Sequence, residues 1–170
     1  IHGFHLTSID LFNIKKEDLW RVLSISSSTV SLNKDNEFIE ASIKGSLKKE
    51  LTQKKNLLCI GDLVHINEQN LIDHIAPRFS SLSRKDSLHQ RKEHTIAANI
   101  DQVIITASLK EPSLKPSLLD RYIIAANIGN LTPILVINKV DLTASKEDKQ
   151  LIKELKKIYN SLSIPIFFVS

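Results

Sequence analysis

The chain has 170 residues, of which 42% are hydrophobic and 25% are charged, and its formal net charge is +4. This composition excludes a disordered or low-complexity protein, and no apolar run approaches the roughly 18 residues that a membrane span needs. Cys59 is the only cysteine, which excludes an internal disulfide and favours a reducing compartment. We therefore expect a cytoplasmic protein, monomeric and without a membrane partner.

The positive charge gathers in two segments. Residues 41–60 carry a net +4 and residues 78–94 a net +3, so the remainder is slightly acidic. Such clustering predicts a surface that faces a polyanion such as RNA, although solvated loops would give the same pattern. The side chains expected to contact RNA are Lys44, Lys48, Lys49, Arg78, Arg84, Arg91 and Lys92.

The first folded part is predicted to be a small barrel over residues 20–77, after an N-terminal extension over residues 1–19. Five short apolar or alternating stretches are typical of strands. They lie at residues 20–25, 29–32, 38–43, 63–66 and 71–75. Five strands within about 60 residues, with no helical pattern between them, indicate an OB-fold-like RNA-binding barrel, and an SH3-like barrel fits the same pattern.

Residues 78–98 differ from the barrel in composition. They are rich in Ser, Arg, Lys and His, and their apolar residues follow no period. We interpret the segment as an exposed basic linker.

From residue 99 to residue 170 the pattern becomes that of an α/β domain. Continuous apolar runs at 103–107, 134–137 and 166–169 predict strands covered on both faces. Two amphipathic helices are expected between them, capped at their N-termini by Ser117 and Ser145. This alternation predicts a parallel sheet with right-handed crossovers.

The residues Asn138-Lys139-Val140-Asp141 follow directly after the second of these strands. Ligands of parallel sheets bind beyond the carboxyl ends of the strands. An ionised Asp141 offers two acceptor oxygens to the N1–H and N2–H₂ donors of guanine, a pair that adenine lacks. Asn138 can hydrogen-bond the purine N7, and Lys139 can lay its alkyl stem along the base. The loop predicts guanine binding.

Five motifs, taken together, resemble one bacterial family in their order and spacing. They read Pro77-Arg78, Leu82-Ser83-Arg84, Ile96-Ala97-Ala98-Asn99-Ile100-Asp101-Gln102-Val103, Leu119-Asp120-Arg121-Tyr122 and Asn138-Lys139-Val140-Asp141-Leu142. The set is similar to the ribosome small-subunit-dependent GTPase A family, and the resemblance covers roughly residues 20–170. It implies an OB-fold-like barrel, then part of a circularly permuted P-loop GTPase domain, then a zinc-binding domain.

The resemblance also implies a function. Such a protein hydrolyses GTP with Mg²⁺ and acts late in maturation of the small (30S) ribosomal subunit, with that subunit and its 16S rRNA as partners. Ser170 matches the start of the family's second guanine-side loop. The phosphate, Mg²⁺ and Zn²⁺ sites would lie outside residues 1–170, and the residue that positions the catalytic water cannot be assigned.

One family motif is missing from these 170 residues. They contain four glycines and no G-x-x-x-x-G-K-[ST] sequence, so nothing here can cradle the β- and γ-phosphates. We therefore expect the phosphate-binding loop to follow Ser170, and residues 1–170 alone to be inactive. Two other interpretations stay open: a non-catalytic rRNA-binding module of an assembly factor, and an unrelated α/β enzyme in which the Asn138–Asp141 turn is incidental.

Overall fold

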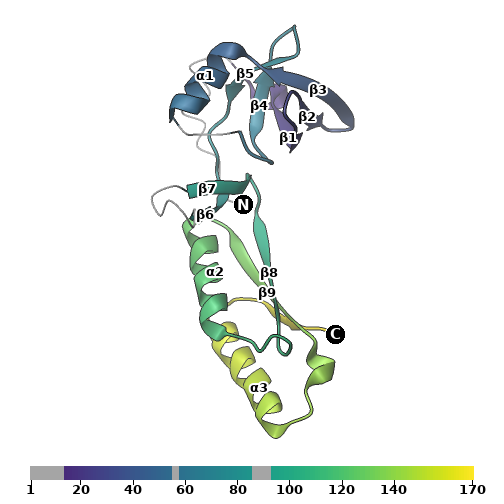
Figure 1. Cartoon of the computed structure of the whole chain (residues 1–170), viewed down its shortest axis with the longest axis vertical. Coiled ribbons are helices and arrows are strands. Elements are labelled where there is room, and N and C mark those ends of the chain that lie inside the picture. The colour runs from purple at the N-terminus through teal and green to yellow at the C-terminus, as the bar shows by residue number, and fades with distance from the viewer. Residues whose placement is uncertain (1–13, 55–57, 86–92) are drawn as a thin grey trace. The chain divides into compact units, whose positions relative to one another are not determined.

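The computed structural model describes residues 14–54, 58–85 and 93–170 (Figure 1). The chain forms two compact units, residues 1–100 and residues 101–170. Within the described ranges, no helix has the length and apolar character needed to cross a membrane. Arg91 and Lys92, and most of the N-terminal extension, lie outside the described residues.

The first unit is built around a closed five-stranded barrel. Its elements are η2 (Lys16–Asp18), β1 (Trp20–Ile25), β2 (Val30–Lys34), β3 (Glu37–Ile43), α1 (Gly45–Lys54), β4 (Leu63–Ile66), β5 (Leu71–Ile75), β6 (Ser81–Lys85) and β7 (Glu93–Ala98). The barrel order is β1-β2-β3-β5-β4, closed by antiparallel pairing of β1 with β4. The parallel pairing of β3 with β5, and the helix between β3 and β4, give the barrel its OB-fold-like character.

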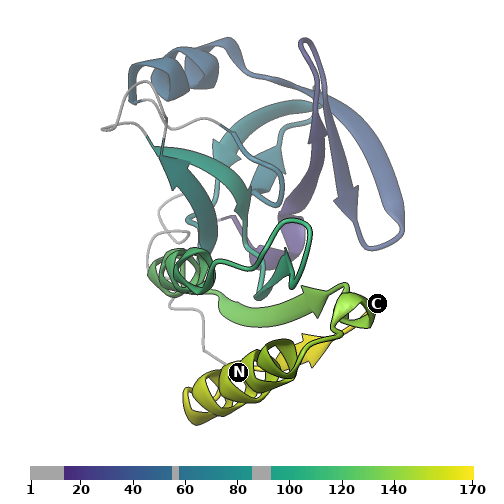
Figure 2. The same ribbon diagram turned by 60° about the horizontal axis from the view of Figure 1, so that its bottom comes forward.

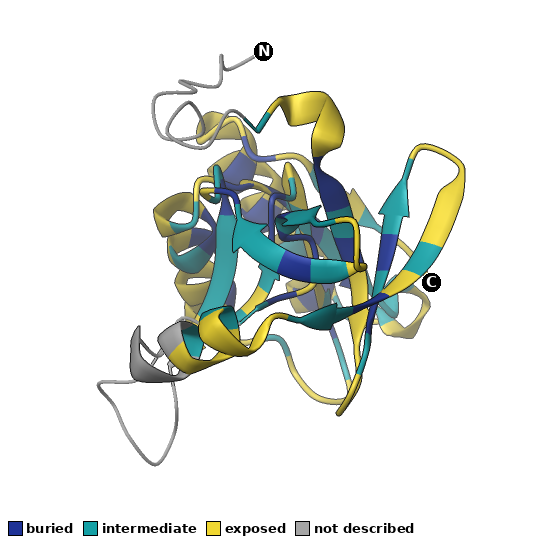
Figure 3. Ribbon diagram, turned by 90° about the horizontal axis from the view of Figure 1, so that it is seen from above, coloured by how far each residue is buried: buried dark blue, intermediate teal, exposed yellow. Residues whose placement is uncertain are grey.

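Alternation of side chains along the strands fills the inside of this barrel. Residues at every second position point inward, and those packed together in the core are Trp20, Val22, Val30, Leu32, Ala41, Val64 and Ile72. Figure 3 shows buried segments, in dark blue, separated by intermediate segments in teal and exposed segments in yellow. The five predicted strands are confirmed, and Trp20 lies in the barrel core.

The prediction that no helix interrupts the barrel is wrong, because α1 lies between β3 and β4. Leu47 packs against the barrel core, while most of the helix is Lys, Ser, Thr and Gln. A helix whose only large apolar residues are Leu47 and Leu51 has too weak an apolar period to be found in the sequence.

The interpretation of residues 78–98 as an irregular linker is also wrong over most of its length. Strands β6 and β7 pair antiparallel, with a register shift between Leu82 and Ser83. Ala98 at the end of β7 donates its N–H to the carbonyl of Ile60, 2.9 Å away, and so joins the hairpin to the barrel. The hairpin has no clear alternation because it packs mainly through polar contacts, described below.

The second unit is a three-stranded parallel sheet with two helices. Its elements are β8 (Gln102–Ser108), α2 (Pro116–Ile128), β9 (Thr132–Asn138), η3 (Val140–Leu142), α3 (Lys146–Ser161) and β10 (Ile166–Phe168), with strand order β10-β9-β8. Figure 2 brings this unit forward. Ser145 caps α3 as predicted, in a capping box with Asp148. Helix α2 starts at Pro116 rather than after Ser117, because proline's fixed φ suits a first helical position.

Within the described unit the two helices cover one face of the sheet, and coverage of the second face stays a prediction. Both helices pack on the face that carries Ile105, Leu135 and Ile137, as expected when two right-handed crossovers run in the same direction along a sheet. On the opposite face Ile104 is 65% exposed and Phe167 is 55% exposed. We call this the open face; from the register it consists of Ile104, Thr106, Ile134, Val136 and Phe167.

Candidate functional site

The carboxyl ends of the three parallel strands meet at one edge of the sheet. Ser108 lies beside Asn138 in the register of β8 and β9, and the N–H of Leu109 donates to the Asn138 carbonyl at 3.0 Å. On the other side of β9, the N–H of Val140 donates to the carbonyl of Val169 at 3.2 Å. The loop predicted to bind guanine is therefore held from both neighbouring strand ends.

Lys139 fixes the shape of this loop. Its backbone is left-handed, with φ of 61°, a conformation that is costly for a residue with a side chain and is often found at functional sites. Its N–H donates to Asn138 Oδ1 at 2.7 Å, and its Nζ donates to the Glu111 carbonyl at 2.6 Å. Lys139 thus ties the β9 loop to the loop that follows β8.

The groups predicted to read guanine remain available. Asn138 uses Oδ1 within the loop, while its Nδ2 makes no hydrogen bond to any residue in the described ranges. Asp141 is exposed, and its carboxylate likewise has no partner in the part of the chain that the structure describes. Ser170 is exposed and follows Val169, which bonds to the loop. The structure therefore gathers all four predicted residues at one strand edge, with a donor and an acceptor free.

The predicted RNA contacts fall into separate groups. Lys44, Lys48 and Lys49 are exposed at the start of α1, where a helix brings residues four apart onto one face. Arg84 is exposed on β6. The structure thus supports one basic cluster at α1 and one exposed arginine on the hairpin.

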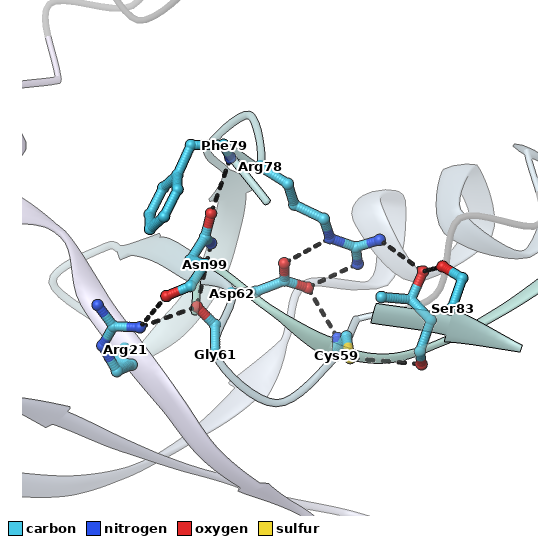
Figure 4. Close-up of polar contacts among 9 residues, drawn as sticks. Arg21, Cys59, Gly61, Asp62, Arg78, Phe79, Ser83 and Asn99 are labelled. Atoms are coloured by element: carbon cyan, nitrogen blue, oxygen red, sulfur yellow. Dashed lines mark hydrogen bonds and ion pairs between the residues drawn. The ribbon is translucent and has the colours of Figure 1, made fainter. Parts of the chain in front are cut away.

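Arg78 is a correction to the predicted RNA contacts. Its guanidinium forms a bidentate pair with Asp62, with Nε–Oδ1 at 2.7 Å and Nη2–Oδ2 at 2.8 Å, and Nη1 donates to Thr95 Oγ1 at 3.2 Å (Figure 4). The side chain of Asp62 is fully buried. Because a buried carboxylate needs such a partner, Arg78 is a structural residue and not a surface cation.

Further contacts complete what we call the Asp62 cluster: Asp62, Arg78, Cys59 and Thr95. The Cys59 N–H donates to Asp62 Oδ2 at 2.7 Å, and the Cys59 thiol contacts the Thr95 carbonyl at 3.4 Å. Burial, and then the charge of Asp62, raise the pKa of the Cys59 thiol. Thr95 belongs to β7 and Asp62 directly precedes β4, so the cluster joins the hairpin to the barrel.

A second group of polar contacts joins the same two parts. Asn99 Nδ2 donates to the Gly61 carbonyl at 3.0 Å, and Asn99 Oδ1 accepts from the Phe79 N–H at 3.0 Å. Arg21 donates from β1 to the Asn99 carbonyl at 3.1 Å (Figure 4). Gly61 has φ of +89°, and an added Cβ there would lie 2.0 Å from the Ala98 oxygen. The backbones of barrel and hairpin are therefore too close for any side chain at position 61.

The structural roles of Asp62 and Gly61 are not evident from the sequence. Adjacent glycine and aspartate usually indicate only a turn, and two of their partners, Arg78 and Asn99, lie 16 and 38 residues away in the chain. Arg78 and Asn99 were among the motif residues, but no local pattern separates a buried ion pair from an exposed basic contact. The sequence feature that could have indicated a buried ion pair is an isolated acidic residue, Asp62, directly before an apolar strand.

Polar pairs also join α3 to other elements of the second unit. Tyr159 donates its hydroxyl to Asp120 at 3.1 Å, and burial together with this acceptor raises the pKa of Tyr159 to about 12. Lys110 lies 2.8 Å from Asp148, and the pKa of Asp148 is lowered mainly by the Lys110 hydrogen bond. In the described ranges, no three His, Cys, Asp or Glu side chains gather in a way that could hold a metal ion.

A closed OB-fold-like barrel followed by a parallel sheet, with Asn-Lys-x-Asp after the sheet's second strand, is the fold of part of a circularly permuted P-loop GTPase domain. The family model of the RsgA GTPase matches residues 75–170. The chain belongs to the RsgA GTPase family.

Individual relatives agree with this assignment. The small ribosomal subunit biogenesis GTPase RsgA of Shewanella oneidensis is 32% identical over 138 residues, which are 80% of this chain and 38% of that protein. The Haemophilus influenzae protein of the same name is 38% identical over 121 residues, covering 66% of this chain and 34% of its own length. The matched part of the chain thus spans between about a third and two fifths of the length of these relatives.

Solved structures support the fold. The crystal structure of YjeQ from Thermotoga maritima matches 90% of this chain and 51% of its own, with a TM-score of 0.68 and 24% identity. YloQ, titled a circularly permuted GTPase, matches 89% of this chain and 51% of its own, with a TM-score of 0.65 and 19% identity. The choice between an OB-fold-like and an SH3-like barrel is settled by the barrel topology described above, in favour of the first.

Proposed function

We propose that the protein containing this chain is a GTPase that acts in biogenesis of the small ribosomal subunit. The observation that carries the proposal is the Asn138–Asp141 loop, held at the carboxyl edge of a parallel sheet with its reading groups unpaired. The relatives' names state the same activity and the same particle for those proteins. We expect it to act in the cytoplasm as a monomer.

Each loop residue has a distinct role in guanine recognition. Asp141 accepts from N1–H and N2–H₂ of the base, so it selects guanine over adenine. Asn138 donates from Nδ2 to N7, since its Oδ1 is already used by the Lys139 N–H. Lys139 packs its alkyl stem along the base while its Nζ holds the Glu111 carbonyl. Ser170, at the neighbouring strand end, starts the second loop on the guanine side.

The remaining parts of the active site are proposed to lie in other residues of the whole protein. The 170 residues contain no P-loop sequence, so the phosphates and Mg²⁺ must be held elsewhere, and this chain alone is expected to be inactive. The apolar open face of the sheet is available for a further layer of the same domain. A zinc-binding domain is expected from the family resemblance.

The chain's second role is proposed to be rRNA binding through the barrel. The cluster of Lys44, Lys48 and Lys49 at α1, together with Arg84 on the hairpin, provides exposed cations. Arg91 and Lys92 are retained as candidates from the sequence. Such phosphate contacts would make binding weaken with salt, each contributing about 0.7–0.9 to the log–log slope.

The test of guanine recognition is Asp141→Asn in the full-length protein. The change replaces an acceptor oxygen with a donor, so the binding free energy of GTP should become less favourable by about 2–4 kcal/mol. Xanthosine triphosphate, which carries an oxygen at C2, should bind better than it does to the unchanged protein. Calorimetric titration with both nucleotides measures this exchange. Asp101→Asn is the matched control, because Asp101 is exposed in the same unit, at the start of β8, away from the strand ends that hold the loop.

Two results would contradict the proposal. Equal GTP affinity in Asp141→Asn and the control would show that the loop does not read guanine. GTP binding without any turnover, in the presence of purified small ribosomal subunits, would favour the non-catalytic rRNA-binding module instead.

A further inference from the structure

Helix α3 carries a row of lysines that neither the fold nor the guanine site uses. Lys146, Lys149, Lys153 and Lys157 are all exposed, and none forms an ion pair with a residue that the structure describes. We call these four the lysine row. At about 100° per residue they lie within one narrow stripe that runs roughly 16 Å along the helix.

The stripe lies opposite the core. Leu155 and Tyr159 are buried and set the inner face of α3, and the lysine row is on the far side of the helix from them. The row carries no apolar or aromatic side chain. Lysine is depleted in the cores of protein interfaces, where aromatic and apolar residues dominate, so the row is unlike a surface for binding another protein.

Two of the three acidic residues of α3 are engaged with other side chains. Asp148 is buried against Lys110 and Ser145, and Glu154 accepts from Gln150 at 2.9 Å on the flank of the helix. Residues 101–170 contain nine Lys and Arg and seven Asp and Glu, and α3 carries five of the nine cations and three of the seven acids. The positive charge of this unit therefore comes from α3.

The arrangement is unfavourable for an isolated helix. Lys149 and Lys153, and Lys153 and Lys157, are like-charged pairs four residues apart, which destabilise a helix. Lys146 and Lys149 also lie near the helix N-terminus, where cations are disfavoured. A bound polyanion would relieve both effects, because its charges would lie along the stripe.

We propose that the lysine row binds the phosphate backbone of rRNA, as a second RNA-contacting surface separate from the barrel. This inference rests on the proposed function, which supplies the small ribosomal subunit as the target. It adds that the GTPase unit itself contacts RNA, through side chains that do not touch the guanine loop.

The test compares two full-length variants with matched charge changes. Lys149→Glu with Lys153→Glu alters the row, whereas Lys115→Glu with Arg121→Glu alters two exposed cations elsewhere in the unit. The probe is protein-free small-subunit rRNA, titrated at several salt concentrations. The row variant should bind roughly tenfold or more weakly at about 0.1 M salt, with a log–log slope shallower by about 1.4–1.8. The control should keep the wild-type slope.

A milder variant and a second ligand complete the experiment. Lys149→Gln with Lys153→Gln removes the charges without adding repulsion, and should give the same change in slope. GTP affinity, measured by calorimetry, should be unchanged in every variant. This measurement distinguishes an error in the RNA-binding proposal from an error in the guanine-binding proposal. A slope equal to wild type, or equal losses in row and control variants, would overturn the proposal. A loss of affinity for intact subunits but not for bare rRNA would indicate an acidic protein partner and overturn it equally.

Discussion

The two units of this chain bury their apolar residues in different ways. The barrel closes on itself, so that its core residues, such as Val64 and Ile72, are fully buried by its own strands. The α/β unit covers only one face of its sheet, and Ile104 on the open face remains 65% exposed. Closure of the sheet, rather than the number of its strands, allows the first unit to bury its core with its own described residues.

The two units also differ in how deeply their polar contacts are buried. In the first unit a fully buried carboxylate, Asp62, holds the hairpin to the barrel. In the second unit the pair of Tyr159 with Asp120 joins a buried hydroxyl to an exposed carboxylate. We therefore expect substitutions at the Asp62 cluster to have the largest effects on stability, and the following predictions test that ranking.

The largest effect is expected for Asp62→Ala. Removing the carboxylate leaves the Arg78 guanidinium and the Cys59 N–H without their partner, which should lower the free energy of unfolding by about 3 kcal/mol. Trp20, the only tryptophan, lies in the barrel core and reports this unit by fluorescence during denaturation. The control is Glu68→Ala, an exposed carboxylate in the same unit. If Asp62→Ala and Arg78→Ala have additive effects in the double variant, the pair is not coupled as described.

A somewhat smaller effect is expected for Gly61→Ala. The methyl group would meet the Ala98 carbonyl oxygen, and φ of +89° is strained for alanine. We expect a loss of about 2–3 kcal/mol, again measured through Trp20 fluorescence. Gly45→Ala is the matched control, because no atom lies within 4 Å of an added Cβ at the start of α1. Similar midpoints for the two variants would contradict the close approach of barrel and hairpin.

The second unit should respond to alkaline pH through Tyr159. Its pKa is raised from 10 to about 12 in the fold, so the stability from the neutral hydroxyl is fully present below pH 10 and is lost as the pH rises toward 12. The loss should reach at most about 2–3 kcal/mol. Helical circular dichroism, dominated by α2 and α3, follows this unit.

Two variants isolate the contribution of Tyr159 from that of other groups that titrate at high pH. Tyr159→Phe should lose about 1 kcal/mol at neutral pH and show a weaker decline above pH 10. Tyr122→Phe, at an exposed tyrosine of α2, should retain the wild-type decline. An identical alkaline decline in all three proteins would show that Tyr159 does not contribute.

The sequence by itself determined the features that are encoded locally. Strand alternation set the five barrel strands, and the capping box set the start of α3 at Ser145. The Asn138–Asp141 loop was identified because its residues are adjacent in the chain and follow an apolar strand. Periodicity and short motifs need only neighbouring residues, so they can be recognised without coordinates.

The tertiary structure alone decided which charges are exposed and which are paired. Arg78 belongs to the basic segment 78–94, yet it is taken by Asp62, 16 residues earlier in the chain. Coverage of only one sheet face depends likewise on the path of both crossovers. These properties arise from distances between residues that no local pattern brings together.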